Sequence, residues 1–281
     1  MNKVWTELVA ENPVIKDSQR TILKNLNPRN WQSNMAVSVT LVGVLYVALI
    51  GLSIQGIQFL DASLFAMILL VLSVLVPAII VYGLIAGEKE KRTLDLLLVA
   101  PVTAPQIIVA KIIKVVVPIV LLEILLTIPA IFFTIARVNQ GLPAMLNSRG
   151  EGVASVILSA MLISFCVAVF VSGLSLFISS INKSTAAALA GVLAMLFVVY
   201  VVYAVVAGVM ATISPEFSNW MIGIHPFGAQ ANVMWGNDKS IPTWLVYFVS
   251  CFIHLGLGIL LFLGATKRLD SERMKVKVKD A

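Results

Sequence analysis

Six long apolar segments constrain the fold of this chain more than any other feature of its sequence. They cover residues 35–54, 63–86, 112–136, 153–180, 185–212 and 244–265. A helix needs about 20 mostly apolar residues to cross a bilayer. Unpaired backbone groups are costly in hydrocarbon, so such a continuous run must be helical there. The sequence therefore predicts an all-α integral membrane protein with six transmembrane helices.

Composition agrees with this fold class. Hydrophobic residues make up 59% of the chain and charged residues only 12%, whereas a soluble domain carries roughly 25% charged residues. Residues 1–34 contain many charges and no apolar run, unlike a signal peptide. We therefore expect the N-terminus to stay in the cytoplasm and residues 35–265 to form a six-span domain.

The placement of positive charge predicts the orientation in the plasma (inner) membrane. With the N-terminus inside, 17 of the 20 Lys and Arg residues fall in cytoplasmic segments, and the others are Arg137, Arg149 and Lys239. Cytoplasmic loops are enriched in Lys and Arg, so both termini are expected in the cytoplasm. The net charge of +6 then indicates contact with anionic inner-leaflet lipid, not nucleic acid.

The two ends of the chain flank the spans. In residues 1–34, Asn12 and Pro13 are typical of a helix start, and the following residues alternate between an apolar and a cationic face. This pattern favours an amphipathic helix on the inner leaflet over a solvated leader. Residues 266–281 are expected to form a basic cytoplasmic tail.

The segment at 87–111, between the second and third spans, carries the most information. Five consecutive charged residues, 88–92, precede an apolar helical face made by Leu94, Leu97 and Leu98. Pro101 is expected to end that helix. Thr103 and Gln106 have the spacing of a capping box that starts the next helix. The sequence predicts a short charged helix, a tight turn and a new helix at the cytoplasmic surface.

This string of residues resembles the cytoplasmic segment of type-2 ABC exporter permeases. The family pattern runs roughly Glu-x-Glu-x-(Gly or Arg)-Thr-Leu-(Glu/Asp)-x-Leu-Leu-x-x-Pro-(Val/Ile)-(Ser/Thr). Its positions are occupied here by Glu88, Glu90, Thr93, Leu94, Asp95, Leu97, Leu98, Pro101, Val102 and Thr103. Arg92 stands where many members have Gly, which we interpret as a harmless variant. The six spans, the N-terminal helix and the cytoplasmic termini extend the resemblance over nearly the whole chain.

The resemblance implies a permease subunit that forms the translocation path of an exporter. In this family the segment is a coupling helix that docks on a separate ATPase subunit. The implied docking residues are Glu88, Glu90, Thr93, Leu94, Asp95, Leu97, Leu98, Pro101 and Thr103. A second permease chain, identical or different, is the other implied partner. The sequence has no Gly-x-x-x-x-Gly-Lys-(Ser/Thr) phosphate loop, so ATP and magnesium are expected on the ATPase partner, and this chain is not expected to be an enzyme.

Glu123 is an ionisable residue inside the third apolar segment. A charge at this depth is costly and should face protein or water. It is a candidate gating carboxylate, with a structural hydrogen bond to a neighbouring helix as the alternative. His254 is a possible partner, although a satisfied interior histidine is the simpler interpretation. Cys166 and Cys251 lie in apolar segments and outside any metal-binding spacing, so buried thiols and no metal site are expected.

Residues 213–243 form the outer connection between the fifth and sixth spans. Their apolar and aromatic content is compatible with re-entrant helices, as in the resembled family, or with a folded loop. Two other functions stay open from the residues alone. One is an ion-coupled secondary transporter that uses Glu123, although matching repeats are not evident. The other is a non-transporting membrane partner that relays the motion of an ATPase.

Overall fold

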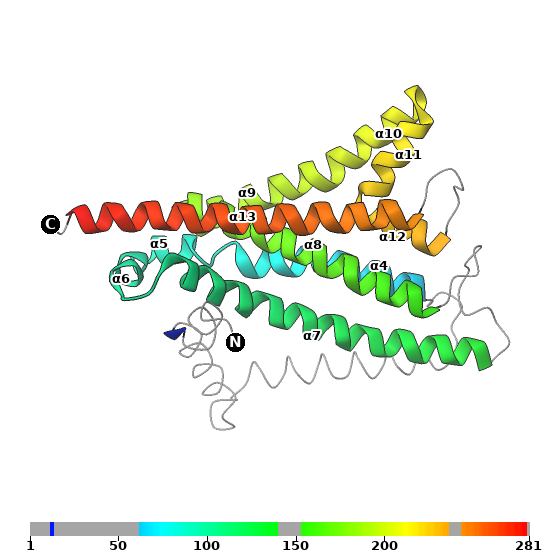
Figure 1. Cartoon of the computed structure of the whole chain (residues 1–281), viewed down its shortest axis with the longest axis horizontal. Helices are drawn as coiled ribbons and strands as arrows, with labels where there is room; N and C mark the ends of the chain where they lie inside the picture. Colours follow the sequence, from blue (N-terminus) through cyan, green and yellow to red (C-terminus); the bar gives the residue numbers. More distant parts are fainter. Residues whose placement is uncertain (1–11, 14–61, 140–152, 236–242, 280–281) are drawn as a thin grey trace.

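The computed structural model describes residues 12–13, 62–139, 153–235 and 243–279, and every element within them is helical (Figure 1). The elements are α4 (Ala62–Val81), α5 (Ala86–Glu90), α6 (Leu94–Val99), α7 (Ala104–Asn139), α8 (Val153–Ile181), α9 (Thr185–Leu196), the π-helix η3 (Phe197–Val202), α10 (Tyr203–Ile213), α11 (Pro215–Ile224), α12 (Pro226–Trp235) and α13 (Thr243–Lys279).

Four helical stretches are long and apolar enough to cross a membrane. They are Phe65–Glu90, Ser155–Ile181, Thr185–Ile213 and Thr243–Met274, and they fall on the predicted second, fourth, fifth and sixth spans. The predicted third span, 112–136, lies within α7, a helix of 36 residues. The predicted first span, 35–54, lies outside the described residues, so the count of six spans stays a prediction.

Helix α8 occupies the centre of the bundle and packs along both α13 and α4. In its most apolar stretch 72% of the residues are buried inside the chain, against 17% for the α9–α10 stretch. Where α8 crosses α13, a Cβ on Gly173 would lie 2.6 Å from the carbonyl oxygen of Gly258. Small residues allow this close approach of two helices in a membrane.

The second predicted span does not continue unbroken into the segment at 87–111. After α4 the chain makes a turn at residues 82–85 before α5 begins. The Oγ atom of Ser179 on α8 accepts hydrogen bonds from the backbone amides of Ile85 (3.1 Å) and Ala86 (2.9 Å). Because these amides start a new helix, the serine supplies the acceptor that the break removes. The apolar pattern at 63–86 does not indicate this break.

The bundle has two distinct ends (Figure 1). Helices α5 and α6 lie at one end, beside the C-terminal part of α13, and α10, α11 and α12 lie at the other. Helices α11 and α12 fold back onto the bundle. Ser250 on α13 donates to the carbonyl of Ile224 (2.7 Å), and Ser218 donates to the carbonyl of Ala207 on α10 (2.7 Å). Two helices therefore occupy much of 213–243, while their depth in the membrane stays a prediction.

Candidate functional site

Helix α5 ends in a left-handed turn at Arg92, whose φ is 55°. The amide of Arg92 donates to the carbonyl of Lys89 (3.0 Å), and the amide of Thr93 donates to the carbonyl of Glu88 (2.9 Å). This pair of bonds is the Schellman motif, whose left-handed position is usually glycine. A side chain at that position costs about 1–2 kcal/mol. The variant Arg92 is therefore tolerated here at a conformational cost.

Helix α6 has a buried face and an exposed face. Leu94 and Leu98 are 4% and 2% exposed, and they join a cluster of buried side chains from α4, α7, α8 and α13. Leu96 and Val99, on the opposite side, are 74% and 63% exposed. The leucine ridge that the sequence assigned to a partner therefore attaches α6 to its own chain. The apolar surface of α6 that stays exposed is that of Leu96 and Val99.

The start of α7 has the predicted capping box. The Oε1 atom of Gln106 accepts a hydrogen bond from the amide of Thr103 (2.8 Å), and the amide of Gln106 donates to Oγ1 of Thr103 (3.4 Å). Each side chain thus satisfies the backbone of the other. Helix α6 ends at Val99, two residues before Pro101. The structure has a helix, a turn and a new helix here, with the charged residues and the leucines divided between α5 and α6 by the turn at Arg92.

The start of the predicted interfacial helix lies next to α7. Pro13 is helical and Asn12 directly precedes it, as the sequence predicts. The side-chain amide of Asn12 donates to the carbonyl of Gln106 (2.8 Å). The rest of the predicted amphipathic helix lies outside the described residues.

Glu88 and Glu90 bind helices of their own chain. Oε1 of Glu88 lies 2.7 Å from Nζ of Lys111 on α7, which also donates to the carbonyl of Leu84 (2.6 Å). Oε2 of Glu90 accepts from the amide (2.9 Å) and hydroxyl (2.8 Å) of Thr185, the first residue of α9. A carboxylate at a helix N-terminus accepts hydrogen bonds from free amides, and its negative charge interacts favourably with the helix dipole. Both carboxylates therefore fasten the segment to transmembrane helices.

Two further contacts join the segment to α13. Nζ of Lys89 lies 2.8 Å from Oε1 of Glu272 and also donates to the carbonyl of Ser180 on α8. The guanidinium of Arg273 donates to the carbonyl of Ala100 (3.3 Å). Lys89 belongs to α5 and Ala100 follows the last residue of α6, so α13 contacts the segment both before and after α6. Sequence patterns around Glu272 and Arg273 give no indication of this contact.

The predicted docking residues thus divide by accessibility. Leu94 and Leu98 are buried, and Glu88 and Leu97 are half-buried. Those that remain exposed are Glu90, Thr93, Asp95, Pro101 and Thr103. The exposed ones, together with Leu96 and Val99, all lie in or next to α5 and α6, at this end of the bundle. We call this set of seven residues the docking surface.

Glu123 on α7 is buried, with 4% of its surface exposed. Its Oε1 atom has no hydrogen-bond partner among the described residues. The thiol of Cys166 on α8 lies near Glu123 and contacts the thiol of Cys251 on α13. Both cysteines are free and buried, as expected from the sequence. An unpaired carboxylate oxygen at this depth is costly, so Glu123 can accept a hydrogen bond that this conformation does not provide.

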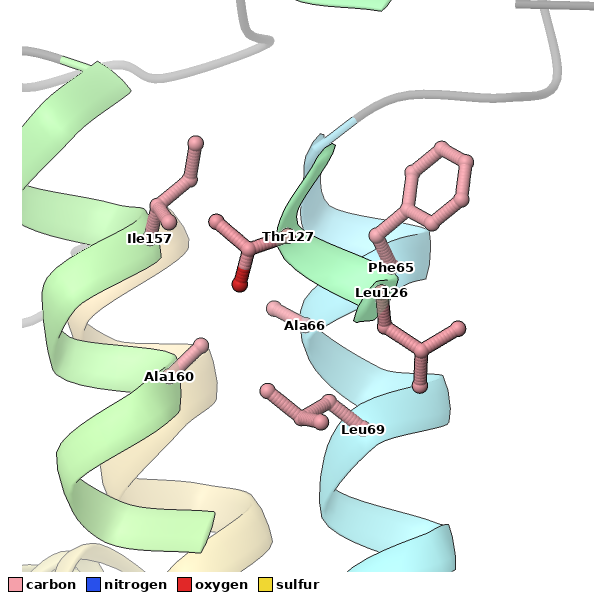
Figure 2. A pocket seen from close by; sticks show the side chains of 7 residues that line it. All are labelled: Phe65, Ala66, Leu69, Leu126, Thr127, Ile157 and Ala160. Carbon is pink, nitrogen blue, oxygen red and sulfur yellow. The ribbon is translucent and has the colours of Figure 1, made fainter. Parts of the chain in front are cut away.

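A small apolar cavity lies one helical turn from Glu123, between α4, α7 and α8 (Figure 2). Thr127 lines it, and the hydroxyl of Thr127 donates to the backbone carbonyl of Glu123 (2.8 Å). The other lining residues are Phe65, Ala66, Leu69, Leu126, Ile157 and Ala160. Its volume of about 20 Å³ accommodates little more than one water molecule. This conformation therefore offers no room there for a substrate.

His254 is oriented by its own helix. Its Nδ1 atom lies 2.8 Å from the carbonyl oxygen of Ser250, and its ring contacts Phe170 edge-on at a centroid distance of 5.4 Å. These contacts account for His254 without Glu123. Among the described residues, no group of three or more His, Cys, Asp or Glu side chains is arranged to hold a metal ion.

Comparison with known proteins places the chain in a family. A search of curated proteins found no match. The family model for the ABC-2 family transporter protein matches residues 14–263, which include the α5–α7 segment, the central helix α8 and the membrane part of α13. Because this match covers most of the chain, the protein belongs to the ABC-2 transporter family, whose multi-pass membrane subunits carry no ATPase domain of their own.

Proposed function

We propose that this protein is the permease subunit of an ATP-driven exporter and that it receives the ATPase through the docking surface. The observation that carries this proposal is the division of residues 88–103. Side chains and backbone carbonyls of this stretch bind α7, α8, α9 and α13, whereas Leu96 and Val99 stay exposed beyond the apolar spans. A surface of this kind can receive a partner and pass its movement to four helices.

The nucleotide chemistry belongs to the partner in this proposal. The sequence lacks a phosphate loop, so ATP and magnesium bind to a separate ATPase subunit. Both termini lie in the cytoplasm, as the distribution of Lys and Arg favours. Anionic inner-leaflet lipid contacts the same cytoplasmic cations. A reporter enzyme active only in the cytoplasm, fused to the C-terminus, tests this orientation, and its inactivity in the fusion would contradict it.

A second permease chain completes the transporter in this proposal. The α9–α10 stretch is the least buried of the four candidate spans. Its small residues Ala186, Ala190 and Ala194, spaced four apart, are all exposed. Small residues at this spacing allow close helix contact in membranes, which favours a protein neighbour on this side. Lipid is the alternative neighbour, and cross-linking of cysteines introduced at these positions distinguishes the two.

The unpaired oxygen of Glu123 favours a second candidate function. An ion-coupled secondary transporter uses a buried carboxylate that takes up and releases a proton or cation. A relay of ATPase motion without transport is compatible with the docking surface as well. Copurification of an ATPase favours both ATPase-linked functions over the secondary transporter.

The decisive experiment is copurification of the chain with the ATPase encoded beside it. Leu96→Asp is expected to weaken that association about tenfold or more, because burial of one leucine contributes about 1.5–3 kcal/mol. Leu96 is 74% exposed, so the variant is expected to fold. Ile181→Asp, at a 48% exposed position at the end of α8, is the matched control. Wild-type association of Leu96→Asp would remove the docking assignment.

A further inference from the structure

Helix α13 is much longer than a membrane requires. Its 37 residues span roughly 55 Å at 1.5 Å per residue, while the hydrocarbon core of a bilayer is about 30 Å thick. Its apolar sequence ends near Ala265, and charged residues begin at Lys267. The helix nevertheless continues to Lys279. The predicted tail, residues 266–281, is thus largely a continuation of the sixth span.

One face of this extension lies against α6. Ala265 and Leu269, spaced four apart, are fully buried and share a cluster with Leu94 and Leu98. Residues at this spacing lie on the same side of a helix. Lys267 and Arg268, on the other side, are exposed. The extension is therefore amphipathic, and the chain itself covers its apolar side.

Polar contacts also join α5 and the end of α6 to the extension of α13. Glu272 pairs with Lys89 at 2.8 Å before α6, and Arg273 donates to the carbonyl of Ala100 at 3.3 Å after it. Lys89 and Glu272 are 183 residues apart in sequence. No covalent connection near α6 enforces this arrangement, unlike the short link from α6 to α7. The contact can therefore be removed by substitution without cutting the chain.

The opposite end of α13 holds α11. Ser250 donates to the carbonyl of Ile224 at 2.7 Å. A Cβ on Gly223 would lie 2.4 Å from Val246, so the backbone of α11 packs directly on the α13 side chain. A single unbroken helix thus contacts α6 at one end of the bundle and α11 at the other (Figure 1).

We propose that α13 is the rod that carries movement of α5 and α6 to α11 and α12, and that Leu269, Glu272 and Arg273 are the positioning residues that attach α5 and α6 to it. This inference rests on the proposed function, because the movement originates in the ATPase. Movement of α6 also reaches α7 through the short covalent link, so α13 is a second path for the same movement. These three residues act through α6 and contact neither nucleotide nor substrate.

The experiment measures ATP-driven movement at the far end of α13. Spin labels are placed at Leu245→Cys on α13 and Ile68→Cys on α4, both at exposed positions, with the two native cysteines replaced by Ala. The label distance is measured in the assembled complex with and without ATP and vanadate. Leu269→Ala and Glu272→Ala are compared with Lys267→Ala, which removes an exposed charge from the same extension.

We expect Leu269→Ala and Glu272→Ala to retain the ATPase and to lose the ATP-driven distance change. Lys267→Ala should retain both, and Leu269→Met should restore the distance change because it conserves the buried volume. An unchanged distance response in Leu269→Ala and Glu272→Ala would overturn the proposal. Loss of the ATPase from these variants would also overturn it, since the extension would then be part of the docking surface.

A second measurement tests the contact between Lys89 and Glu272 independently of the proposed function. Thermal unfolding of the chain without ATPase is compared for Lys89→Ala, Glu272→Ala and the double variant. A contact between the two side chains predicts that the double variant loses less than the sum of the single losses. Strict additivity would refute the attachment of α5 to α13 itself. Failure of the wild-type chain to bind any ATPase would instead refute the proposed function and the rod's role in coupling.

Discussion

Glutamates in the α5–α6 segment and in the predicted third span differ in the contacts that their carboxylates make. Glu88 lies beside Lys111 at 2.7 Å, and Glu90 caps α9 through Thr185. Glu123 is buried at 4% exposure, and its Oε1 atom has no partner within the described part of the chain. Glu88 and Glu90 each connect two helices, although the Oε2 atom of Glu88 is also buried without a hydrogen-bond partner, whereas no connection to another helix is made by Oε1 of Glu123.

This difference distinguishes residues that stabilise the fold from residues that lower its stability. A paired carboxylate at the surface offsets its own desolvation by binding a cation or free amides. An unpaired buried oxygen destabilises the folded chain. The Oε1 atom of Glu123 makes no hydrogen bond in this conformation, which is compatible with a role for Glu123 in a second conformation. The following three substitutions test this contrast, and the largest expected effect comes first.

Leu98→Asp tests whether the buried face of α6 is structural. Leu98 is 2% exposed, so the substitution removes an apolar contact and buries a carboxylate without a partner. We expect a loss of about 3–5 kcal/mol in the free energy of unfolding, measured by thermal unfolding in detergent. Leu96→Asp, two residues away on the exposed face, should leave this energy nearly unchanged. Equal losses in both variants would contradict the assignment of the two faces.

Glu123→Leu tests the unpaired carboxylate directly. Replacement of an unsatisfied buried group by an apolar one is expected to raise the free energy of unfolding by about 1–3 kcal/mol. Glu88→Leu is the matched control, because it removes the ion pair of the largely buried Lys111 and should lower the same energy by a similar amount. Destabilisation by both variants would make Glu123 a structural group.

Arg92→Gly tests the left-handed turn after α5. Glycine adopts a φ of 55° without a steric penalty, so the variant should gain about 0.5–1 kcal/mol in the free energy of unfolding. Arg92→Ala removes the same charge but keeps the penalty, and it should show no gain. Thermal unfolding of the two variants compares them. An equal gain in both would attribute the effect to charge and not to backbone conformation.

Local features of the cytoplasmic segment could be predicted from the sequence. The capping box of Thr103 and Gln106 and the end of α6 before Pro101 depend on residues no more than a few positions apart. The free, buried state of Cys166 and Cys251 also follows from their apolar surroundings. The break in span two could not be predicted, because its acceptor, Ser179, lies about 94 residues further along the chain.

Sequence patterns do not predict which face of α6 is buried and which is exposed. Leucines at 94, 96, 97 and 98 make this short helix apolar on nearly all sides. Periodicity in six residues does not say which side is covered. The extension of α13 decides this, because Leu269 occupies the surface beside Leu94 and Leu98 and leaves Leu96 exposed.

The sequence by itself determined the membrane class, the positions of four long apolar helices and the position of the short helices between α4 and α7. These properties depend on local hydropathy and on short-range capping, which act between residues close in the chain. The tertiary structure alone decided which residues of that segment pack against the other helices and which stay exposed. That choice depends on contacts such as Lys89–Glu272, whose members meet only after the helices between them have packed.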